Sequence, residues 1–305
     1  MKLTNEENIS FKSGIVALVG KTNAGKSTLL NSILGEKVSI VSDRVQTTRN
    51  LIRAILNLEN SQIVFLDTPG IHYGIGDMGA KMNKIAREIV KNVDAIILVI
   101  DSLLLPDDVD KGWFKRIKQL NKPLIIACNK TDVSTKNIIL FKNLWDELEE
   151  ENNKNKSHWI NISALKNNGL DKLTEKIIDL MPLGPKLFPE DVLTDYPIKL
   201  NISDIIREKL INRLHKELPH SIAVWVDEYN NTNDLIEINA FVYVERHSQK
   251  GIVIGNKGLL IKKVRIEAES ELNEIYQKKH SLKLKVKVEK NWRKNFWIMK
   301  KLGYS

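Results

Sequence analysis

Residues 20–27 read GKTNAGKS and directly follow the apolar run IVALV of residues 15–19. A strand that stops on a turn with two glycines and two lysines leads either into a flexible corner or into a site for something negative. Glycines permit backbone conformations that other residues avoid, so successive N–H groups can turn towards one anion. The stretch fits the pattern GxxxxGK[ST], in which the start of a following helix adds positive charge. It therefore predicts a phosphate-binding loop between a strand and a helix.

Each residue type in this loop has a chemical reason. Lys26 is expected to reach the β- and γ-phosphates of a nucleotide, and Ser27 is expected to offer its hydroxyl to Mg²⁺. The expected nucleotide contacts of the loop are Gly20, Lys21, Thr22, Asn23, Ala24, Gly25, Lys26, Ser27 and Thr28.

Short apolar runs alternate with longer amphipathic ones on both sides of the loop. Continuous apolar strands separated by helices are typical of a parallel sheet that is covered on both faces. The two neighbouring runs 51–58 and 62–67 are expected to form an antiparallel edge. The expected strands are 14–20, 51–58, 62–67, 95–101, 124–129 and 158–163, and the expected helices are 26–34, 78–91, 110–121, 136–149 and 170–180.

The motif DTPG follows one of these strands at residues 67–70. Its carboxylate, Asp67, can hold the Mg²⁺ shell, and the N–H of Gly70 can meet a γ-phosphate. The carboxyl ends of strands in an open α/β sheet line the crevice where ligands bind. The contacts expected from this motif are Asp67, Thr68, Pro69 and Gly70.

Two further motifs at strand ends point to guanine. NKTD at residues 129–132 ends in Asp132, whose carboxylate can accept hydrogen bonds from N1–H and the 2-amino group of guanine. Adenine has no such pair of donors, so this carboxylate selects against ATP. Asn129 can offer its amide to N7, and the stem of Lys130 can pack on the ring. The contacts expected here are Asn129, Lys130 and Asp132, with Ser163, Ala164 and Leu165 of the SAL motif presenting backbone N–H to O6.

The pattern changes after a proline-rich stretch, residues 181–197, which holds four of the eight prolines. Proline disfavours helix and central strand, so this stretch is the expected linker. Beyond it the sequence predicts an α+β domain. Its expected helices are 202–218 and 259–276 with a short terminal helix, and its expected strands are 222–228, 234–245 and 282–289.

This second part contains the GxxG sequence GNKG at residues 255–258, which follows an apolar segment and opens a helix with several cations. A small cationic loop lets a nucleic-acid backbone approach closely, and an adjoining apolar groove can hold unstacked bases. That combination is typical of a KH domain, and the order helix–strand–strand–helix–GxxG–helix–strand looks like the type II arrangement. The residues expected to contact RNA are Ile252, Ile254, Gly255, Asn256, Lys257, Gly258, Lys262 and Lys263.

Charge supports a polyanionic partner for this part of the chain. Residues 1–196 carry a formal net charge of +1, whereas residues 197–305 carry +8. Lys283, Lys285 and Lys287 alternate with apolar residues, which predicts a half-buried strand, and whether its charged face touches RNA stays open. Trp292 and Trp297 are expected to be packing residues.

Together the motifs resemble those of the translation-factor-class GTPases and, among these, the Era family. The resemblance covers GKTNAGKST, QTTR, DTPG, NKTD and SAL, and continues through FPEDVLTD, IIREKL, ELPHS and VIGNKG over nearly the whole chain. It implies an α/β P-loop GTPase domain, with a mostly parallel sheet and helices on both faces, followed by an α+β type II KH domain. The expected bounds are 1–181 for the GTPase domain, 182–198 for the linker and 199–305 for the KH domain.

The resemblance also implies an activity and partners. The chain would hydrolyse GTP to GDP with Mg²⁺ as cofactor, bind the 3′ end of 16S rRNA and assist maturation of the 30S subunit. Thr48 of QTTR would be the switch threonine that closes on Mg²⁺ beside Ser27, with Thr47 as the alternative. The expected catalytic residues are Lys26, Thr48 and Gly70.

Two departures from the Ras pattern qualify this expectation. Ile71 stands where Ras-like GTPases carry the glutamine that orients water, so slow intrinsic hydrolysis is expected. Asn23 resembles the asparagine that recruits K⁺ in related GTPases, so K⁺ is a further expected cation; the alternative is that Asn23 only tolerates a tight turn.

Location and rival functions stay as expectations. The single cysteine, Cys128, cannot form an internal disulfide, and residues 1–10 contain no cationic apolar leader, so a cytoplasmic location is expected. The protein is also expected to be a monomer, found in part at the inner face of the cell membrane. One rival is a constitutive RNA-binding protein with an inactive nucleotide domain. The other is a membrane-surface signalling GTPase whose basic domain faces anionic lipid.

Overall fold

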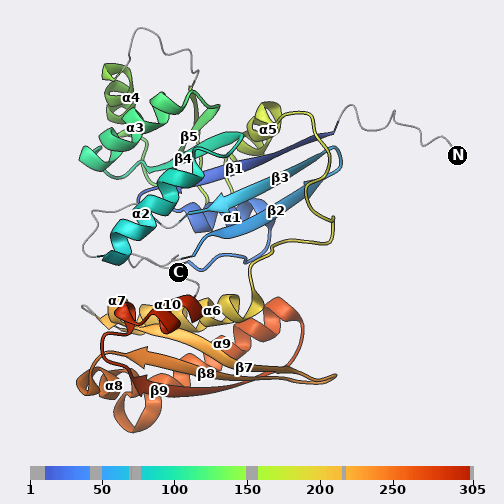
Figure 1. Ribbon diagram of the computed structural model, residues 1–305. Coiled ribbons are helices and arrows are strands. Elements are labelled where there is room, and N and C mark those ends of the chain that lie inside the picture. The colour runs from blue at the N-terminus through green and yellow to red at the C-terminus, as the bar shows by residue number, and fades with distance from the viewer. Residues whose placement is uncertain are drawn as a thin grey trace, which may run out of the picture. The chain divides into compact units, whose positions relative to one another are not determined.

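The computed structural model describes residues 11–41, 50–68, 70, 77–148, 157–214 and 218–302. The chain divides into two units (Figure 1). The first unit is Met1–Ser39 with Leu51–Asp195, and the second is Ile40–Asn50 with Tyr196–Ser305.

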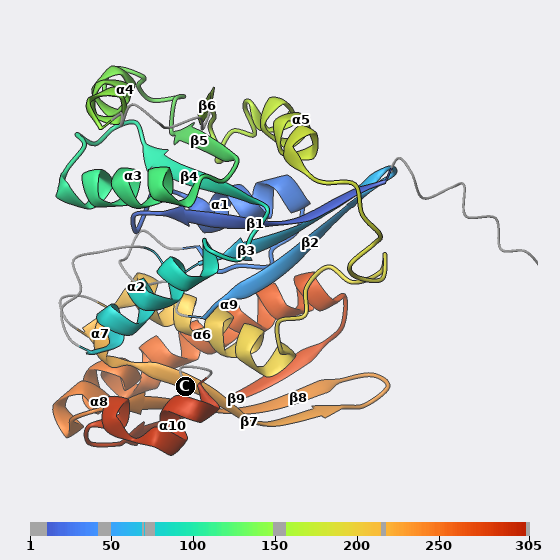
Figure 2. The ribbon, with the colours of Figure 1, turned by 45° about the horizontal axis from the view of Figure 1, so that its top comes forward.

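The first unit is built on a six-stranded sheet of order β2-β3-β1-β4-β5-β6 (Figure 2). Strands β1, β3, β4, β5 and β6 are parallel, and β2 pairs antiparallel with β3, which confirms the expected edge. The strands are β1 (Lys12–Gly20), β2 (Ile52–Leu58), β3 (Ser61–Asp67), β4 (Ala95–Asp101), β5 (Leu124–Asn129) and β6 (Ser157–Asn161).

Helices cover both faces of this sheet because alternate strand residues point to opposite sides. Val16 and Leu18 of β1 join a cluster with α1 and α5, whereas Ala17 and Val19 join one with α2, α3 and α4. The helices are α1 (Lys26–Leu34), α2 (Asp77–Ile89), α3 (Asp108–Leu120), α4 (Ile138–Glu147) and α5 (Leu170–Leu180). The expected α/β architecture is therefore confirmed.

The second unit is an α+β domain with a three-stranded sheet of order β7-β8-β9. Strand β7 (Ala223–Asn231) pairs antiparallel with β8 (Ile236–Val244), and β9 (His280–Val288) pairs parallel with β8. Its main helices are α6 (Ile198–Arg213), α8 (His247–Ile254) and α9 (Leu259–Tyr276), with the short α7 (Leu218–Ser221) and α10 (Phe296–Lys301). One core joins α6 and α9 to one face of the sheet.

The two units differ from the expected bounds in two places. Residues 182–195 do not form a free linker but cluster with the first unit, where Gln62 Oε1 accepts hydrogen bonds from the N–H groups of Leu187 and Phe188 at 2.6 and 2.9 Å. Residues 40–50, which precede β2, cluster with the second unit. Within it Val41 N–H donates to a carboxylate oxygen of Glu208 on α6 at 3.2 Å.

Candidate nucleotide site and nucleic-acid interface

The turn between β1 and α1 is folded around the side chain of Lys26. Its ammonium Nζ donates to the carbonyls of Gly20 at 3.0 Å and Lys21 at 2.9 Å. Gly25 ends the turn with a left-handed φ of 96°, and a Cβ there would lie 2.2 Å from Nδ2 of Asn129. Only glycine fits such a position, so the loop needs the residue that the motif provides.

Lys26 and Asp67 form a buried pair of opposite charges beneath the loop. Burial lowers the pKa of Lys26 to about 8, and the nearby Asp67 carboxylate opposes that shift. Burial likewise raises the pKa of Asp67, opposed by Lys26 and by hydrogen bonds from Ser39 and Ser27. Two charges held out of water in this way are characteristic of a binding site for a charged ligand.

The surroundings of Asp67 fit Mg²⁺. Its Oδ2 accepts hydrogen bonds from Ser27 Oγ and Ser39 Oγ, both at 2.9 Å. Its Oδ1 is buried and has no hydrogen-bond partner among the described residues. Because Mg²⁺ prefers oxygen ligands and keeps several waters, one carboxylate, one hydroxyl and nucleotide phosphates suffice to bind it. Ser27 therefore lies beside the carboxylate that the sequence predicts for the Mg²⁺ shell, and its role as a ligand stays a prediction. Thr48 and its alternative Thr47 lie outside the described residues.

Two features of this site escaped the sequence reasoning. Ser39 lies in no motif, and only the fold brings its hydroxyl to Asp67. Lys21 forms ion pairs with Asp107 at 2.9 Å and Asp110 at 2.6 Å, the two residues of the capping box that begins α3. The ion pairs raise the pKa of Lys21 despite its burial, and they anchor the first turn of the loop.

DTPG lies against the phosphate loop as expected. Thr68 is buried, and its N–H and Oγ1 both donate to the carbonyl of Leu18 on β1, at 3.4 and 2.9 Å. A Cβ on Gly70 would lie 2.6 Å from Thr22 Cγ2 and 2.8 Å from Thr22 Cα, so its backbone is close to the loop. Pro69, Ile71 and His72 are outside the described residues.

Asn129 joins the phosphate loop to the SAL motif. Its Nδ2 donates to the carbonyl of Ala24 at 2.8 Å, and its Oδ1 accepts from Ala164 N–H at 2.9 Å. The expected contact with N7 of guanine therefore rests on the second hydrogen of Nδ2. Asn129 therefore links the phosphate loop to the SAL motif, a role that the sequence reasoning did not anticipate.

The remaining base-binding residues surround this link. Lys130 Nζ forms an ion pair with Asp101 at 2.6 Å, which fixes the stem expected to pack on the ring. Thr131 N–H and Oγ1 donate to the carbonyl of Ile162 at 3.1 and 2.8 Å, so NKTD is tied to the segment that leads into SAL. Asp132 and Leu165 are exposed, and Ser163 is buried. The motifs thus gather at the carboxyl ends of the parallel strands, where the sequence predicts that guanine binds.

The GNKG loop of the second unit is a tight turn between α8 and α9. Gly255, Lys257 and Gly258 all have positive φ, of 75°, 48° and 77°. A Cβ on Gly255 would lie 2.6 Å from Leu260 Cβ and 2.9 Å from its N. Glycine is therefore required at Gly255, and the exposed side chains of Asn256 and Lys257 stand at the tip of the turn.

Apolar and cationic side chains are exposed together around this turn. Ile252 before it and Leu259 after it are 56% and 55% exposed, and Ile266 follows Leu259 by two helical turns. Lys262 and Lys263 are exposed on the same helix, whereas Ile254 is half-buried. Exposed apolar side chains with cations beside them suit unstacked bases and phosphates.

The two tryptophans expected to pack behave differently. Trp292 is buried and donates through Nε1 to the carbonyl of Ser221 at 3.0 Å. Trp297 is 69% exposed on α10, so the prediction was wrong for this residue. Helix α10 has only six residues, and its neighbour Phe296 is also exposed. Throughout the described ranges, every helix is too short or too polar to cross a membrane.

Family models match both units of the chain. A model described as a 50S ribosome-binding GTPase matches residues 15–130, and a KH domain model matches residues 217–293. Curated relatives match end to end. GTPase Era of Thermoanaerobacter pseudethanolicus is 41% identical over 97% of this chain and 98% of its own length. GTPase Era of Caldicellulosiruptor saccharolyticus is 40% identical over 97% and 99%.

Two solved structures match over the same length. An Era protein in complex with MgGDPNP and nucleotides 1506–1542 of 16S ribosomal RNA is 38% identical, with a TM-score of 0.89 over 97% of this chain and 99% of that one. A point variant of Aquifex aeolicus Era bound to GDP·AlF₄⁻ is 37% identical, with a TM-score of 0.88 over 97% and 100%.

Proposed function

The chain belongs to the Era family of GTPases, and from this premise we propose that it assists assembly of the 30S ribosomal subunit by binding the 3′ end of 16S rRNA. Its enzymatic activity is the hydrolysis of GTP to GDP and phosphate. The GNKG turn, with exposed isoleucine, leucine and lysine side chains around it, is the observation that supports RNA as the ligand of the second unit.

The geometry of the first unit supports a proposal for how GTP is held. Lys26 and the N–H groups of the loop bind the β- and γ-phosphates, while Asp132 pairs with the guanine edge. Ser27 would hold Mg²⁺ close to Asp67. The ion would offset the negative charge of the β- and γ-phosphates. Water attacks the γ-phosphorus as the bond to the bridging oxygen breaks, and Gly70 offers its N–H to the transferred group. We assign Thr48 to the Mg²⁺ shell as the residue that closes on bound GTP, with Thr47 as the alternative.

The relation between nucleotide and RNA binding can be measured directly. Filter binding of an RNA with the 16S 3′-end sequence is compared for nucleotide-free, GDP-bound and GTP-analogue-bound protein. We expect the GTP-analogue form to bind most tightly, since switch regions of GTPases order around the γ-phosphate. Affinity is expected to fall steeply with salt. Equal affinity for this RNA and for a scrambled sequence would contradict the proposal.

K⁺ is proposed as an additional cation of the loop. Asn23 adopts a left-handed φ of 63° at the exposed tip of the loop, next to the expected β- and γ-phosphate positions. A monovalent cation there adds positive charge where other GTPases use an arginine. We expect replacement of K⁺ by Na⁺ to slow GTP turnover several-fold, and Asn23→Ala to remove the difference. Identical rates in the two salts would exclude a K⁺ site.

Different observations bear on the rival functions and on the location of the protein. The first rival, a protein with an inactive nucleotide domain, does not fit a GTPase whose Lys26, Ser27 and Asp132 are all retained.

We further propose that the protein is a cytoplasmic monomer and that some of its molecules bind to the inner face of the cell membrane. The exposed Phe296 (62%) and Trp297, next to Lys300 and Lys301, support contact with an anionic surface. Sedimentation with anionic vesicles that is lost in Trp297→Ala would support it, and no sedimentation of the wild type would exclude it.

A further inference from the structure

One face of the second unit's sheet is not used by the GNKG loop. Helices α6 and α9 pack on the other face, where Val226, Ile238 and Val242 are buried in the core. The strand register sets the side chains of the open face in rows. Trp225 of β7 lies opposite Phe241 of β8, which lies opposite Lys285 of β9. The sheet-face patch, as we define it, consists of Phe241, Tyr243, Lys283, Lys285 and Lys287. Trp225 is left out because its Nε1 is buried and Lys301 Nζ lies 5.9 Å from the centroid of its ring.

Three lysines of the patch form a line along β9. Lys283, Lys285 and Lys287 are exposed and point to one face because they alternate along the strand. Their Cα atoms are spaced by about 6.6 Å, given a rise of about 3.3 Å per residue. Such a row of cations can follow the phosphates of an extended strand.

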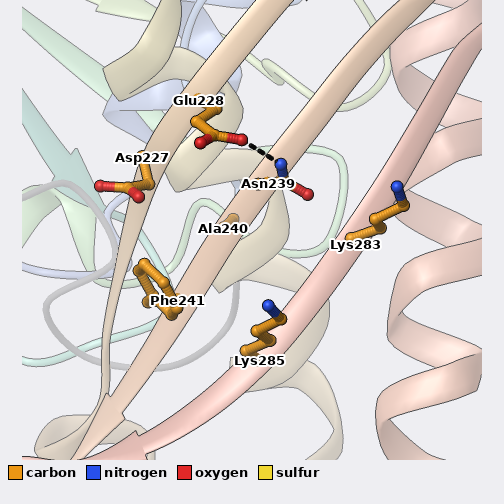
Figure 3. A pocket seen from close by; sticks show the side chains of 7 residues that line it. All are labelled: Asp227, Glu228, Asn239, Ala240, Phe241, Lys283 and Lys285. Atoms are coloured by element: carbon orange, nitrogen blue, oxygen red, sulfur yellow. Dashed lines mark hydrogen bonds between the residues drawn. The ribbon is translucent and has the colours of Figure 1, made fainter.

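Aromatic side chains lie beside this row. Phe241 and Tyr243 are half-buried on β8, with ring centroids 6.3 Å apart, and Lys287 Nζ lies 3.3 Å from the centroid of Phe241. Figure 3 shows Phe241 and the first two lysines around a shallow pocket on this face. Aromatic platforms beside a positive groove are how proteins bind single-stranded nucleic acid without reading its sequence.

The far edge of the sheet has the opposite charge. Asp227 and Glu228 lie on β7, and Glu228 accepts a hydrogen bond from Asn239 of β8 (Figure 3). These carboxylates repel phosphate, so a bound strand is limited to one path. On that path the phosphates would lie over β9, and a base would replace Lys287 Nζ on the ring face of Phe241.

We infer that the sheet-face patch is a second RNA-binding surface, which holds an unpaired segment of the same RNA that the GNKG loop grips. The inference rests on the proposed function. A GxxG loop clamps only about four nucleotides, so a longer RNA has further segments that can bind elsewhere on the protein. The line of cations beside aromatic rings matches such a segment better than it matches a folded protein.

The test compares long and short RNA on the full chain. The patch variant combines Lys283→Gln, Lys285→Gln and Lys287→Gln. Its probes are the RNA of nucleotides 1506–1542 and windows of about four nucleotides from it, measured by fluorescence anisotropy over a range of salt. We expect the long RNA to bind more weakly and its salt slope to fall by about 2, at roughly 0.7 per lost contact with a single strand. The short RNA is expected to bind as to wild type.

A matched control carries the same change of charge elsewhere. Lys111→Gln, Lys115→Gln and Lys172→Gln replace three exposed lysines of the first unit. Phe241→Ala is expected to lower the affinity for the long RNA about fivefold or more, while GTP turnover without RNA stays unchanged. Patch and control variants that lose affinity equally would overturn the inference, as would a patch variant with wild-type affinity and slope. Loss of anionic vesicle binding alone would assign the surface to lipid and also overturn it.

The proposed function can fail separately. Wild-type protein that binds neither long nor short RNA would contradict RNA binding as a whole. Wild-type protein that binds both, with a patch variant indistinguishable from it, would contradict the second surface alone.

Discussion

At the level of single residues, the burial of Lys26 determines how the phosphate loop responds to pH. The residue is enclosed by its own loop and lies near Asp67, and burial lowers its pKa to about 8. Nucleotide phosphates favour the charged form and raise the pKa again. Below pH 8, Lys26 is protonated with or without nucleotide. Above pH 8, Lys26 of the free protein has lost a proton that Lys26 of the nucleotide complex retains.

We therefore expect GDP binding to take up a proton at pH 9 and almost none at pH 7, so that affinity falls as pH rises above about 8. Calorimetric titrations in two buffers of different ionisation enthalpy measure the uptake. The pH 7 titration is the control, and equal apparent enthalpies in both buffers at pH 9 would show that Lys26 stays charged in the free protein.

Asp132 is the residue proposed to select the base. Asp132→Asn removes an acceptor of two guanine hydrogen bonds and supplies a donor, which suits the 2-oxo group of xanthine. We expect GTP affinity to fall at least about a hundredfold, since hydrogen bonds to charged groups contribute about 1.5–3 kcal/mol each. Competition of XTP and GTP for binding measures the change. Asp171→Asn, at an exposed position of α5, is the control, and unchanged preference in Asp132→Asn would disprove the assignment.

The sequence reasoning could propose these site residues because each motif is local. GKTNAGKS, NKTD and SAL predict their contacts from neighbours in the chain. It missed Ser39 and the partners of Lys21 because those contacts join residues 28 to 89 positions apart, where no short pattern exists. The link made by Asn129 is non-local for the same reason.

At the level of elements, the turn between α8 and α9 requires glycine at its first position. Gly255→Ala would press a Cβ against Leu260 at a positive φ. We expect a loss of more than about 1 kcal/mol in the unfolding free energy of the second unit and weaker RNA binding, with unchanged GTP turnover in the absence of RNA.

Gly251 supplies the matched control on α8. A Cβ there meets nothing within 4 Å, so Gly251→Ala is expected to stabilise the helix by roughly 0.5–1 kcal/mol and leave RNA affinity intact. Denaturant titration and anisotropy measure both variants. If the two substitutions behaved alike, the close approach at Gly255 would not matter.

The bounds of the helices show where sequence patterns are sufficient to predict an element. Helices α1, α5 and α9 lie where the apolar periodicity predicts them. The expected helix 202–218 is wrong at both ends, since α6 begins at Ile198 and ends at Arg213. Helix α6 is buried around most of its circumference, including Asp204, Arg207 and Glu208, so it lacks the polar face by which a surface helix is recognised.

At the level of the whole molecule, residues 40–50 belong with a unit that starts at residue 196. Asn50 is buried, and its Nδ2 donates to Tyr196 Oη at 2.8 Å and to the carbonyl of Leu302 at 3.3 Å. No sequence pattern predicts this assignment, because it joins parts of the chain separated by a complete domain.

Asn50→Ala removes both bonds, while Tyr196 Oη keeps its hydrogen bond to Asp204. We expect the second unit to lose about 1–3 kcal/mol of unfolding free energy, seen as faster hydrogen exchange in β7, β8 and β9. Asn230→Ala, at an exposed position of β7, is the control. Unchanged exchange in Asn50→Ala would mean that the buried bonds add nothing to the unit.

The bond between Asn50 and Leu302 spans 252 positions of the chain. Bacterial-type synthesis at about 5–20 residues per second separates the appearance of donor and acceptor by roughly 13–50 s. A nascent polypeptide therefore carries an early segment whose final partners have not yet been translated. Premature termination near the 3′ end of the message would leave that segment without one of its acceptors, although every residue of the phosphate loop had been made.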